Sequence, residues 1–193
     1  MPDSFFIAAI LALLLTPGPT NTLLTVAAAA SGFRSSLPLL IGELAGYLAV
    51  VVPLATIAAS VLAGHPALST ALRFTAALWV LFLAVRLWRV SSRDKLQDNT
   101  FPATVGQVFL TTVLNPKAPI IGLVLMPHGS LVQIAPAIGL FSLLVAGAGT
   151  SFLVLGSLIG RAPILSPQLV YRVAAVCLGV FSLGLAGAAS GLI

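Results

Sequence analysis

Long uncharged stretches alternate with short polar segments along this chain. Five segments contain no Asp, Glu, Lys or Arg, and they cover residues 4–33, 44–72, 99–116, 118–160 and 173–193. A helix needs about 20 mostly apolar residues to cross the roughly 30 Å hydrocarbon core of a bilayer. The pattern therefore predicts six transmembrane helices, over residues 4–29, 37–62, 67–88, 104–126, 133–159 and 170–192.

The composition supports this interpretation. Hydrophobic residues make up 59% of the chain and charged residues 7%, whereas soluble domains contain about 45–50% apolar and about 25% charged residues. So few charged side chains cannot form the polar surface of a soluble domain. We expect an all-α, multi-pass protein that consists of one transporter domain over residues 1–193, with the lipid bilayer around it.

The basic residues between the predicted helices fall in alternate loops. The first, third and fifth loops, with the helix ends beside them, contain Arg34, Arg86, Arg89, Arg93, Lys95, Arg161 and Arg172. Both termini and the other two loops contain no Lys or Arg, and Arg73 lies about one turn inside the third predicted helix. Cytoplasmic loops carry the Lys and Arg excess, so we predict that both termini lie outside. Proteins that bind nucleic acid gather basic residues on one face, so the net charge of +5 does not indicate such a partner.

The first predicted helix is interrupted by Thr16-Pro17-Gly18-Pro19. Proline lacks the amide donor and clashes with the preceding turn, and glycine tolerates open backbone conformations. The interruption should therefore free carbonyl and amide groups about 20 Å from the outer end of the helix. In hydrocarbon such groups must be buried in protein or line a wet cavity.

The fourth predicted helix has a similar interruption at Asn115-Pro116-Lys117-Ala118-Pro119. It places an ammonium group at membrane depth, where a Lys costs at least about 2.5–3.5 kcal/mol on insertion scales, so Lys117 should face the bundle interior. An intramembrane ionisable residue suggests a functional site. The structural alternative is that Lys117 is only an ion-pair partner, for example of Glu43.

The two interruptions are related by position. Leu14-Leu15-Thr16-Pro17 is similar to Val113-Leu114-Asn115-Pro116, and each begins a set of three helices. Three helices per half force the halves, residues 1–92 and 100–193 joined by a short basic cytoplasmic loop, into opposite orientations. Inverted repeats with paired Gly/Pro interruptions indicate a transporter site near the midplane. Helix N-termini suit an anion and freed carbonyls suit a cation, so an amino acid fits both.

Glu43 is the only acid inside a predicted helix, about 10 Å from the cytoplasmic end of the second one. The structural interpretation is an interfacial acid paired with Arg34 or Arg86. The functional interpretation is a proton carrier or an acceptor for a substrate ammonium group. Tyr47, one turn further along, is a candidate for the same cavity.

Pairs of glycines at four-residue spacing occur at Gly42/Gly46, Gly156/Gly160 and Gly187/Gly191. Small residues allow membrane helices to approach closely. We predict that these pairs pack helices together.

The run Thr16-Pro17-Gly18-Pro19-Thr20-Asn21, followed by Gly32, Gly42 and Gly46, resembles the LysE/RhtB family of amino-acid exporters. The run Asn115-Pro116-Lys117-Ala118, with Pro127 closing the span, is similar to that family's second signature. The similarity covers nearly the whole chain. It differs in the second helix, where a polar or acidic position of the family is occupied by Tyr47 and the acid lies at Glu43.

The resemblance implies efflux of amino acids or close derivatives from the bacterial cytoplasm through the inner membrane, by antiport with protons. It also implies a six-helix fold of two inverted halves, and a homodimer of such units. The candidate substrate-binding residues are Pro17, Gly18, Pro19, Asn21, Glu43, Tyr47, Asn115, Pro116 and Lys117.

Rival functions depend on residues that the spans lack. An intramembrane enzyme needs a nucleophile with a base, or paired acids, but Glu43 is the only intramembrane acid and Cys177 has no evident activating partner. A transition-metal exporter would prefer a His, Cys and carboxylate cluster. We therefore predict no catalytic residue, cofactor or metal site. An exporter of another small solute or ion, and a non-transporting assembly subunit, stay open as alternatives.

Overall fold

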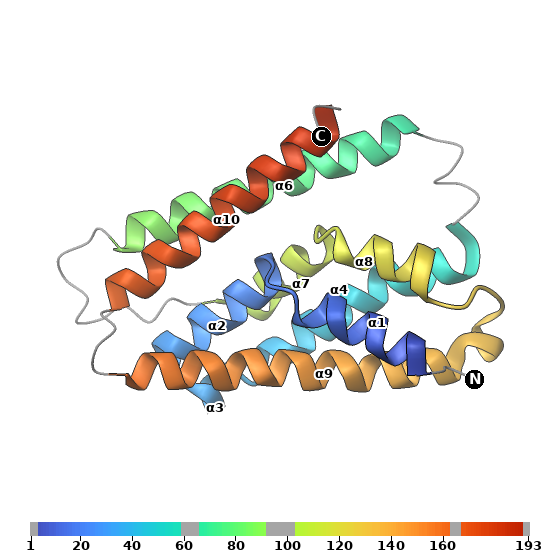
Figure 1. Cartoon of the computed structure of the whole chain (residues 1–193), viewed down its shortest axis with the longest axis horizontal. Coiled ribbons are helices and arrows are strands. Elements are labelled where there is room, and N and C mark those ends of the chain that lie inside the picture. The colour runs from blue at the N-terminus through green and yellow to red at the C-terminus, as the bar shows by residue number, and fades with distance from the viewer. Residues whose placement is uncertain (1–3, 59–65, 92–102, 163–166, 191–193) are drawn as a thin grey trace.

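The computed structural model describes residues 4–58, 66–91, 103–162 and 167–190, and every regular element within these ranges is helical (Figure 1). The elements are α1 (Ser4–Leu15), α2 (Pro19–Ser31), α3 (Phe33–Ser36), α4 (Leu39–Pro53), η1 (Leu54–Ala58), α6 (Pro66–Ser91), α7 (Val105–Val113), α8 (Lys117–Ile120), η3 (Ile121–Leu125), α9 (Leu131–Arg161) and α10 (Pro167–Ser190), of which η1 and η3 are π-helical.

Helical segments occupy the positions of all six predicted helices, as far as the described residues extend. Two continuous helices, Phe33–Thr56 and Leu131–Arg161, are long and apolar enough to cross a membrane. The number rises to four if each of two bent helix pairs is one span. The all-helical class is confirmed for the described residues, and the arrangement with six spans stays a prediction.

Both predicted interruptions are present as bends. The segments on either side of the first break meet at 58°, and those on either side of the second meet at 55°. At the first break Gly18 is extended, as expected for a residue before proline. Pro19 then starts α2, where its missing N–H costs no helical hydrogen bond. At the second break Asn115 precedes Pro116, and α8 starts at Lys117.

Two of the predicted glycine pairs lie at close helix contacts. A Cβ atom on Gly42 would overlap the carbonyl oxygen of Val105, and one on Gly46 would lie 2.7 Å from the Cβ of Thr112, so α4 packs closely on α7. On α9, a Cβ atom on Gly156 would overlap the carbonyl oxygen of Thr25 on α2. Gly160 meets the next turn of α2 in the same way, and the pair Gly187/Gly191 extends beyond the described residues.

The helices form a bundle in which each broken helix lies along a continuous one. α2 packs along α9, and α7 packs along α4, while α6 and α10 pair with each other on one side (Figure 1). The hydroxyl of Ser182 on α10 donates to the carbonyl oxygen of Ala77 on α6 over 2.8 Å. The indole N–H of Trp79 on α6 donates to Thr111 on α7 over 3.0 Å, which ties this pair to the rest of the bundle.

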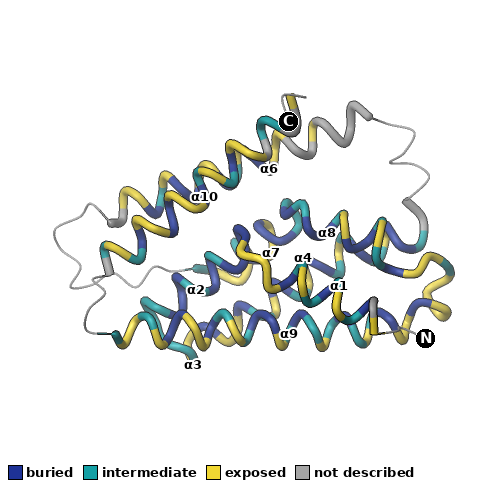
Figure 2. The backbone as a smooth tube through the Cα atoms, viewed as in Figure 1, coloured by how far each residue is buried: buried dark blue, intermediate teal, exposed yellow. Residues whose placement is uncertain are grey.

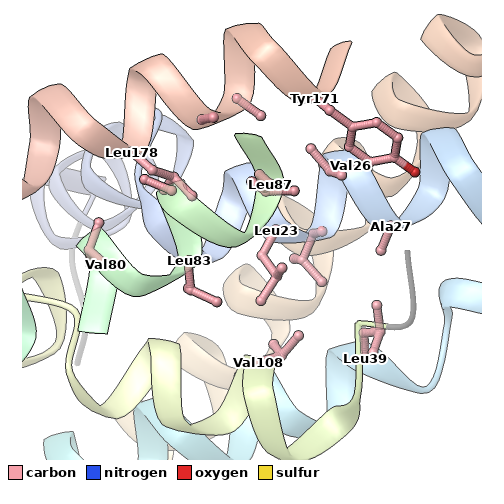
Figure 3. Packing of buried hydrophobic residues seen from close by; sticks show 14 of the residues in the cluster. Leu23, Val26, Ala27, Leu39, Val80, Leu83, Leu87, Val108, Tyr171 and Leu178 are labelled. Carbon is pink, nitrogen blue, oxygen red and sulfur yellow. The ribbon is translucent and has the colours of Figure 1, made fainter. Parts of the chain in front are cut away.

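Two apolar clusters hold the bundle together. One joins α2, α6, α7 and α10, and Figure 3 shows Leu23, Leu83, Val108 and Leu178 in it. The other joins α1, α4, α8 and α9 around buried side chains such as Phe141. Many large apolar side chains nevertheless point outward, and exposed positions line the outer faces of α6, α9 and α10 (Figure 2). Outward apolar faces of this extent suit a lipid environment.

Candidate functional site

The two breaks meet inside the bundle. Lys117, at the start of α8, donates from its ammonium group to the carbonyl oxygen of Thr16 at the end of α1. The side chain is buried, with 5% of its surface exposed. Gly18 leaves room for it, because a Cβ atom there would lie 3.2 Å from Cε and 3.3 Å from Nζ of Lys117. The prediction that this lysine faces the bundle interior is confirmed.

Asn21 satisfies the carbonyl groups that the first break frees. Its side-chain amide donates to the carbonyl oxygens of Leu14, over 2.8 Å, and Thr16, over 3.0 Å. Thr16 also donates from its hydroxyl to the carbonyl oxygen of Ala12, over 2.7 Å. The carboxyl end of α1 is therefore a cluster of carbonyl oxygens, bound by one amide and one ammonium group.

A second group of buried polar side chains links the breaks directly. Thr20 and Thr112 share a hydrogen bond between their hydroxyls, 3.2 Å apart, and the side-chain amide of Asn115 donates to Thr20 over 3.2 Å. The side-chain carbonyl oxygen of Asn115 accepts a hydrogen bond from the backbone N–H of Lys117 over 3.1 Å. Thr20 and Thr112 were not among the predicted site residues. The helical spacing of residues 108, 112 and 115 could have placed Thr112 on the face of Asn115.

The electrostatics of the first break are polarised. The carbonyl end of α1 carries the negative end of its helix dipole, which favours the Lys117 ammonium group there. The N-terminus of α2 carries the positive end of that helix's dipole. Its capping residue is Gly18, which has no side chain to bond the first amides of the helix. Thr16 and Pro17 are exposed while Pro19, Thr20 and Asn21 are buried, so one side of the break is open.

Glu43 lies deeper, on the face of α4 that contacts α9. Only 1% of its surface is exposed, and its Oε2 atom has no hydrogen-bond partner among the described residues. A Cβ atom on Gly149 of α9 would overlap Oε2, so the carboxyl group rests against the α9 backbone. Lys117 lies on α8, which packs against α4, but its ammonium group is bonded to Thr16 instead. Glu43 is thus inside the bundle rather than at its surface.

Tyr47 lies one turn further along the same face. It is fully buried, its ring meets the edge of Phe141 at a centroid distance of 5.8 Å, and its hydroxyl has no partner within the described part of the chain.

Of the nine predicted site residues, one group gathers at the breaks and a pair lies at the α4–α9 contact. The first group contains Pro17, Gly18, Pro19, Asn21, Asn115, Pro116 and Lys117, and the pair is Glu43 and Tyr47. The three prolines shape the backbone, and the amide and ammonium side chains bind its freed groups.

Apolar helices, two proline breaks that meet and a buried lysine between them define this chain as a helical membrane protein with a polar interior site. Comparison with curated proteins gives the class a name. The chain is 38% identical over 92 residues to the cysteine/O-acetylserine efflux proteins of Salmonella choleraesuis and Salmonella typhimurium, a match that covers 48% of this chain and 46% of each relative. The protein of the same name from Salmonella paratyphi A is 37% identical over 92 residues.

These relatives confirm the resemblance to LysE/RhtB-type exporters over about half of the chain. The chain spans about half the length of the curated relatives it matches. No family model matches the sequence. No solved structure matches it either.

Proposed function

We propose that this protein exports a small amino acid or a close derivative from the bacterial cytoplasm across the inner membrane, in exchange for protons. One observation carries the proposal: two proline-broken helices meet at a buried ammonium group that binds the carbonyl end of α1. The curated relatives are efflux proteins named for cysteine and O-acetylserine, which are both small α-amino acids.

In this proposal the substrate binds at the first break. The Lys117 ammonium group already occupies a cation site on the Thr16 carbonyl oxygen, so this end of α1 can accept the ammonium group of an amino acid. The uncapped N-terminus of α2, with the charge of Lys117 beside it, favours the carboxylate. Asn21 holds the backbone of the first break in the required shape, and Asn115 holds that of the second.

The contacts between helices support the predicted inverted halves. The first broken helix lies along α9, the second helix of the other half, and the second broken helix lies along α4, the second helix of the first half. The third helices of the two halves, α6 and α10, pair with each other. A two-fold axis that exchanges the halves would produce this pattern of contacts, as in transporters with inverted repeats.

The orientation follows from the basic residues. α3, with Arg34, contacts α9 at the end of the bundle where α9 finishes at Arg161, opposite the N-terminus (Figure 1). Arg93 and Lys95 lie outside the described residues. We propose that the Arg34 end is cytoplasmic, which places both termini outside. A homodimer, implied by the resemblance, belongs to the same proposal.

Two rival functions make different predictions. An exporter of another solute or ion would use the same breaks without a preference for an α-amino acid. A non-transporting assembly subunit would not depend on an ammonium group at the break.

The experiment is counterflow in proteoliposomes that contain the purified full chain. Vesicles loaded with unlabelled cysteine or O-acetylserine are diluted into the labelled compound, and its uptake is measured. Lys117→Met should lower the exchange rate by at least about tenfold, which corresponds to about 1.4 kcal/mol. Ser157→Ala is the matched control, because among the described residues this buried hydroxyl donates to the carbonyl oxygen of Val154 in its own helix, over 2.8 Å. Absence of exchange for both compounds in the wild type, or unchanged exchange in Lys117→Met, would refute the proposal.

A further inference from the structure

Two buried side-chain oxygens in the described residues have no hydrogen-bond partner, and both belong to one face of α4. They are Oε2 of Glu43 and the hydroxyl of Tyr47, one helical turn apart. Buried polar atoms are bonded in the large majority of cases, so each exception calls for a physical reason. Neither atom is needed to close the proline breaks, whose polar groups are bonded by other side chains.

The Glu43 carboxyl group lies beside the α9 backbone and the apolar side chain of Leu40. The site of a Cβ atom on Gly149 lies against Oε2 of Glu43 and 2.7 Å from Cδ2 of Leu40. The titratable groups that face Glu43 are Tyr47 on its own helix and Lys117 on α8. The packed helices α1, α2 and α7 contain no charged residue, and the only one in α9 is Arg161 in its last turn.

This environment favours the protonated form of the Glu43 carboxyl group over the ionised form. A carboxylate buried without a donor costs several kcal/mol, whereas a neutral carboxyl group costs much less. The conformation described here therefore accommodates the protonated form of Glu43. The ionised form needs a cationic partner, and Lys117 on the adjoining helix α8 carries an ammonium group that can serve as one.

We propose that Glu43 is the proton-binding residue of the exporter, and that Lys117 exchanges between two acceptors. When Glu43 is protonated, the Lys117 ammonium group binds the carbonyl oxygen of Thr16, as observed. When a substrate ammonium group takes that carbonyl oxygen, Lys117 moves to Glu43, and the carboxyl group releases its proton. One proton thus leaves Glu43 for each substrate molecule that binds, and this coupled exchange is what an antiporter requires.

Gly149 positions the carboxyl group of Glu43. Because it has no side chain, the carboxyl group of Glu43 can lie against the α9 backbone in its neutral form. A methyl group at this position would push the carboxyl group away from α9. Gly147, two residues earlier on the same helix, has no atom within 4 Å of the site of a Cβ atom and offers the matched comparison.

This inference rests on the proposed function, and its test separates the two. Proteoliposomes are used in two modes: substrate exchange at equal pH, and uphill transport driven by a pH gradient, with a trapped pH dye to record proton flux. Glu43→Gln removes the acceptor to which Lys117 moves when substrate binds. It should therefore lower gradient-driven transport and substrate-linked proton flux by about tenfold or more, within the range of coupling free energies, and it should lower exchange as well. Glu43→Asp, which keeps a titratable group, should retain both modes, as should Ser157→Ala.

Each outcome decides the matter. Coupled proton flux in Glu43→Gln equal to that of the wild type would overturn the inference and leave the export function standing. Exchange in Glu43→Gln equal to that of the wild type would also overturn it, because Lys117 would then leave the Thr16 carbonyl oxygen without an ionised acceptor at Glu43. Infrared difference spectra of the wild type should contain the C=O stretch of a protonated carboxyl group that Glu43→Gln removes, and its absence would overturn the inference without any transport assay.

Discussion

The contact between α2 and α9 can be tested with two glycines of one helix. Gly156 faces the backbone of α2, where a Cβ atom would overlap the carbonyl oxygen of Thr25 and lie 2.9 Å from its carbonyl carbon and 3.0 Å from the Cβ of Ala28. Gly147 lies earlier on the same helix and has open space around the site of its Cβ atom. The same substitution, glycine to alanine, therefore has opposite effects at the two positions.

The magnitudes follow from two opposing terms. Replacing Gly by Ala inside a helix stabilises by about 0.5–1 kcal/mol, because the unfolded chain loses freedom. Overpacking a close contact costs about 1–3 kcal/mol, and here the obstructing atoms belong to the backbone, which cannot rotate away. Gly156→Ala should therefore lower the free energy of unfolding by up to about 2.5 kcal/mol, the difference of these terms. Gly147→Ala should raise it by up to about 1 kcal/mol.

The assay is unfolding of each purified variant in the same mild detergent, followed by far-ultraviolet circular dichroism against denaturant and temperature. The two variants should differ by about 1–3 kcal/mol, which is the overpacking term alone and corresponds to a factor of about 5 or more in the unfolding equilibrium. If Gly156→Ala is as stable as Gly147→Ala, α2 and α9 do not pack in the way described. Gly160→Ala, which meets the carbonyl oxygen of Ala29, should behave as Gly156→Ala does.

Four further predictions concern the polar interior. Asn21→Ala removes donors from two carbonyl oxygens and should destabilise by about 1–3 kcal/mol in the same unfolding assay, whereas Thr25→Ala, which removes a bond within its own helix, should have little effect. Gly149→Ala should shift the pH dependence of transport, and Gly147→Ala should not. The double variant Lys117→Met/Glu43→Gln should be no worse coupled than either single variant, because residues that act as a pair are not additive. Cysteamine, which lacks the carboxylate, and 3-mercaptopropionate, which lacks the ammonium group, should both compete poorly with cysteine in counterflow.

Local chemistry was sufficient to predict the breaks and the inward direction of Lys117. Proline and glycine act on their own turn of helix, and a charge in hydrocarbon has few places to go. The acceptor of Lys117 could not be predicted, because Thr16 lies 101 residues earlier in the chain and offers only its backbone. The hydrogen bond between Thr20 and Thr112, over 92 residues of separation, was missed for the same reason.

The surroundings of Glu43 are the clearest example of a feature that could not be predicted from the sequence. Pairing with Lys117, Arg34 or Arg86 was a reasonable expectation because these residues carry the opposite charge. In the structure the carboxyl group instead meets Gly149, a residue that the sequence does not distinguish from the other glycines of α9. Open glycines and those in close contacts look alike until the helices are placed side by side.

Lys117 and Glu43, the two ionisable groups of the polar interior discussed above, are best understood together. Buried ion pairs can often be replaced by apolar residues at no loss of stability, so a structural protein gains little from Lys117 and Glu43 together. A proton gradient acts on a carrier only through a group that binds the proton differently in its two conformations. Glu43 is the only acid within the predicted spans. Because its Oε2 atom has no hydrogen-bond partner among the described residues, the free energy of this conformation depends on whether the carboxyl group is protonated. In the proposed mechanism, a chain without Glu43 would keep both breaks but would lack the group that links the binding of substrate to the release of a proton.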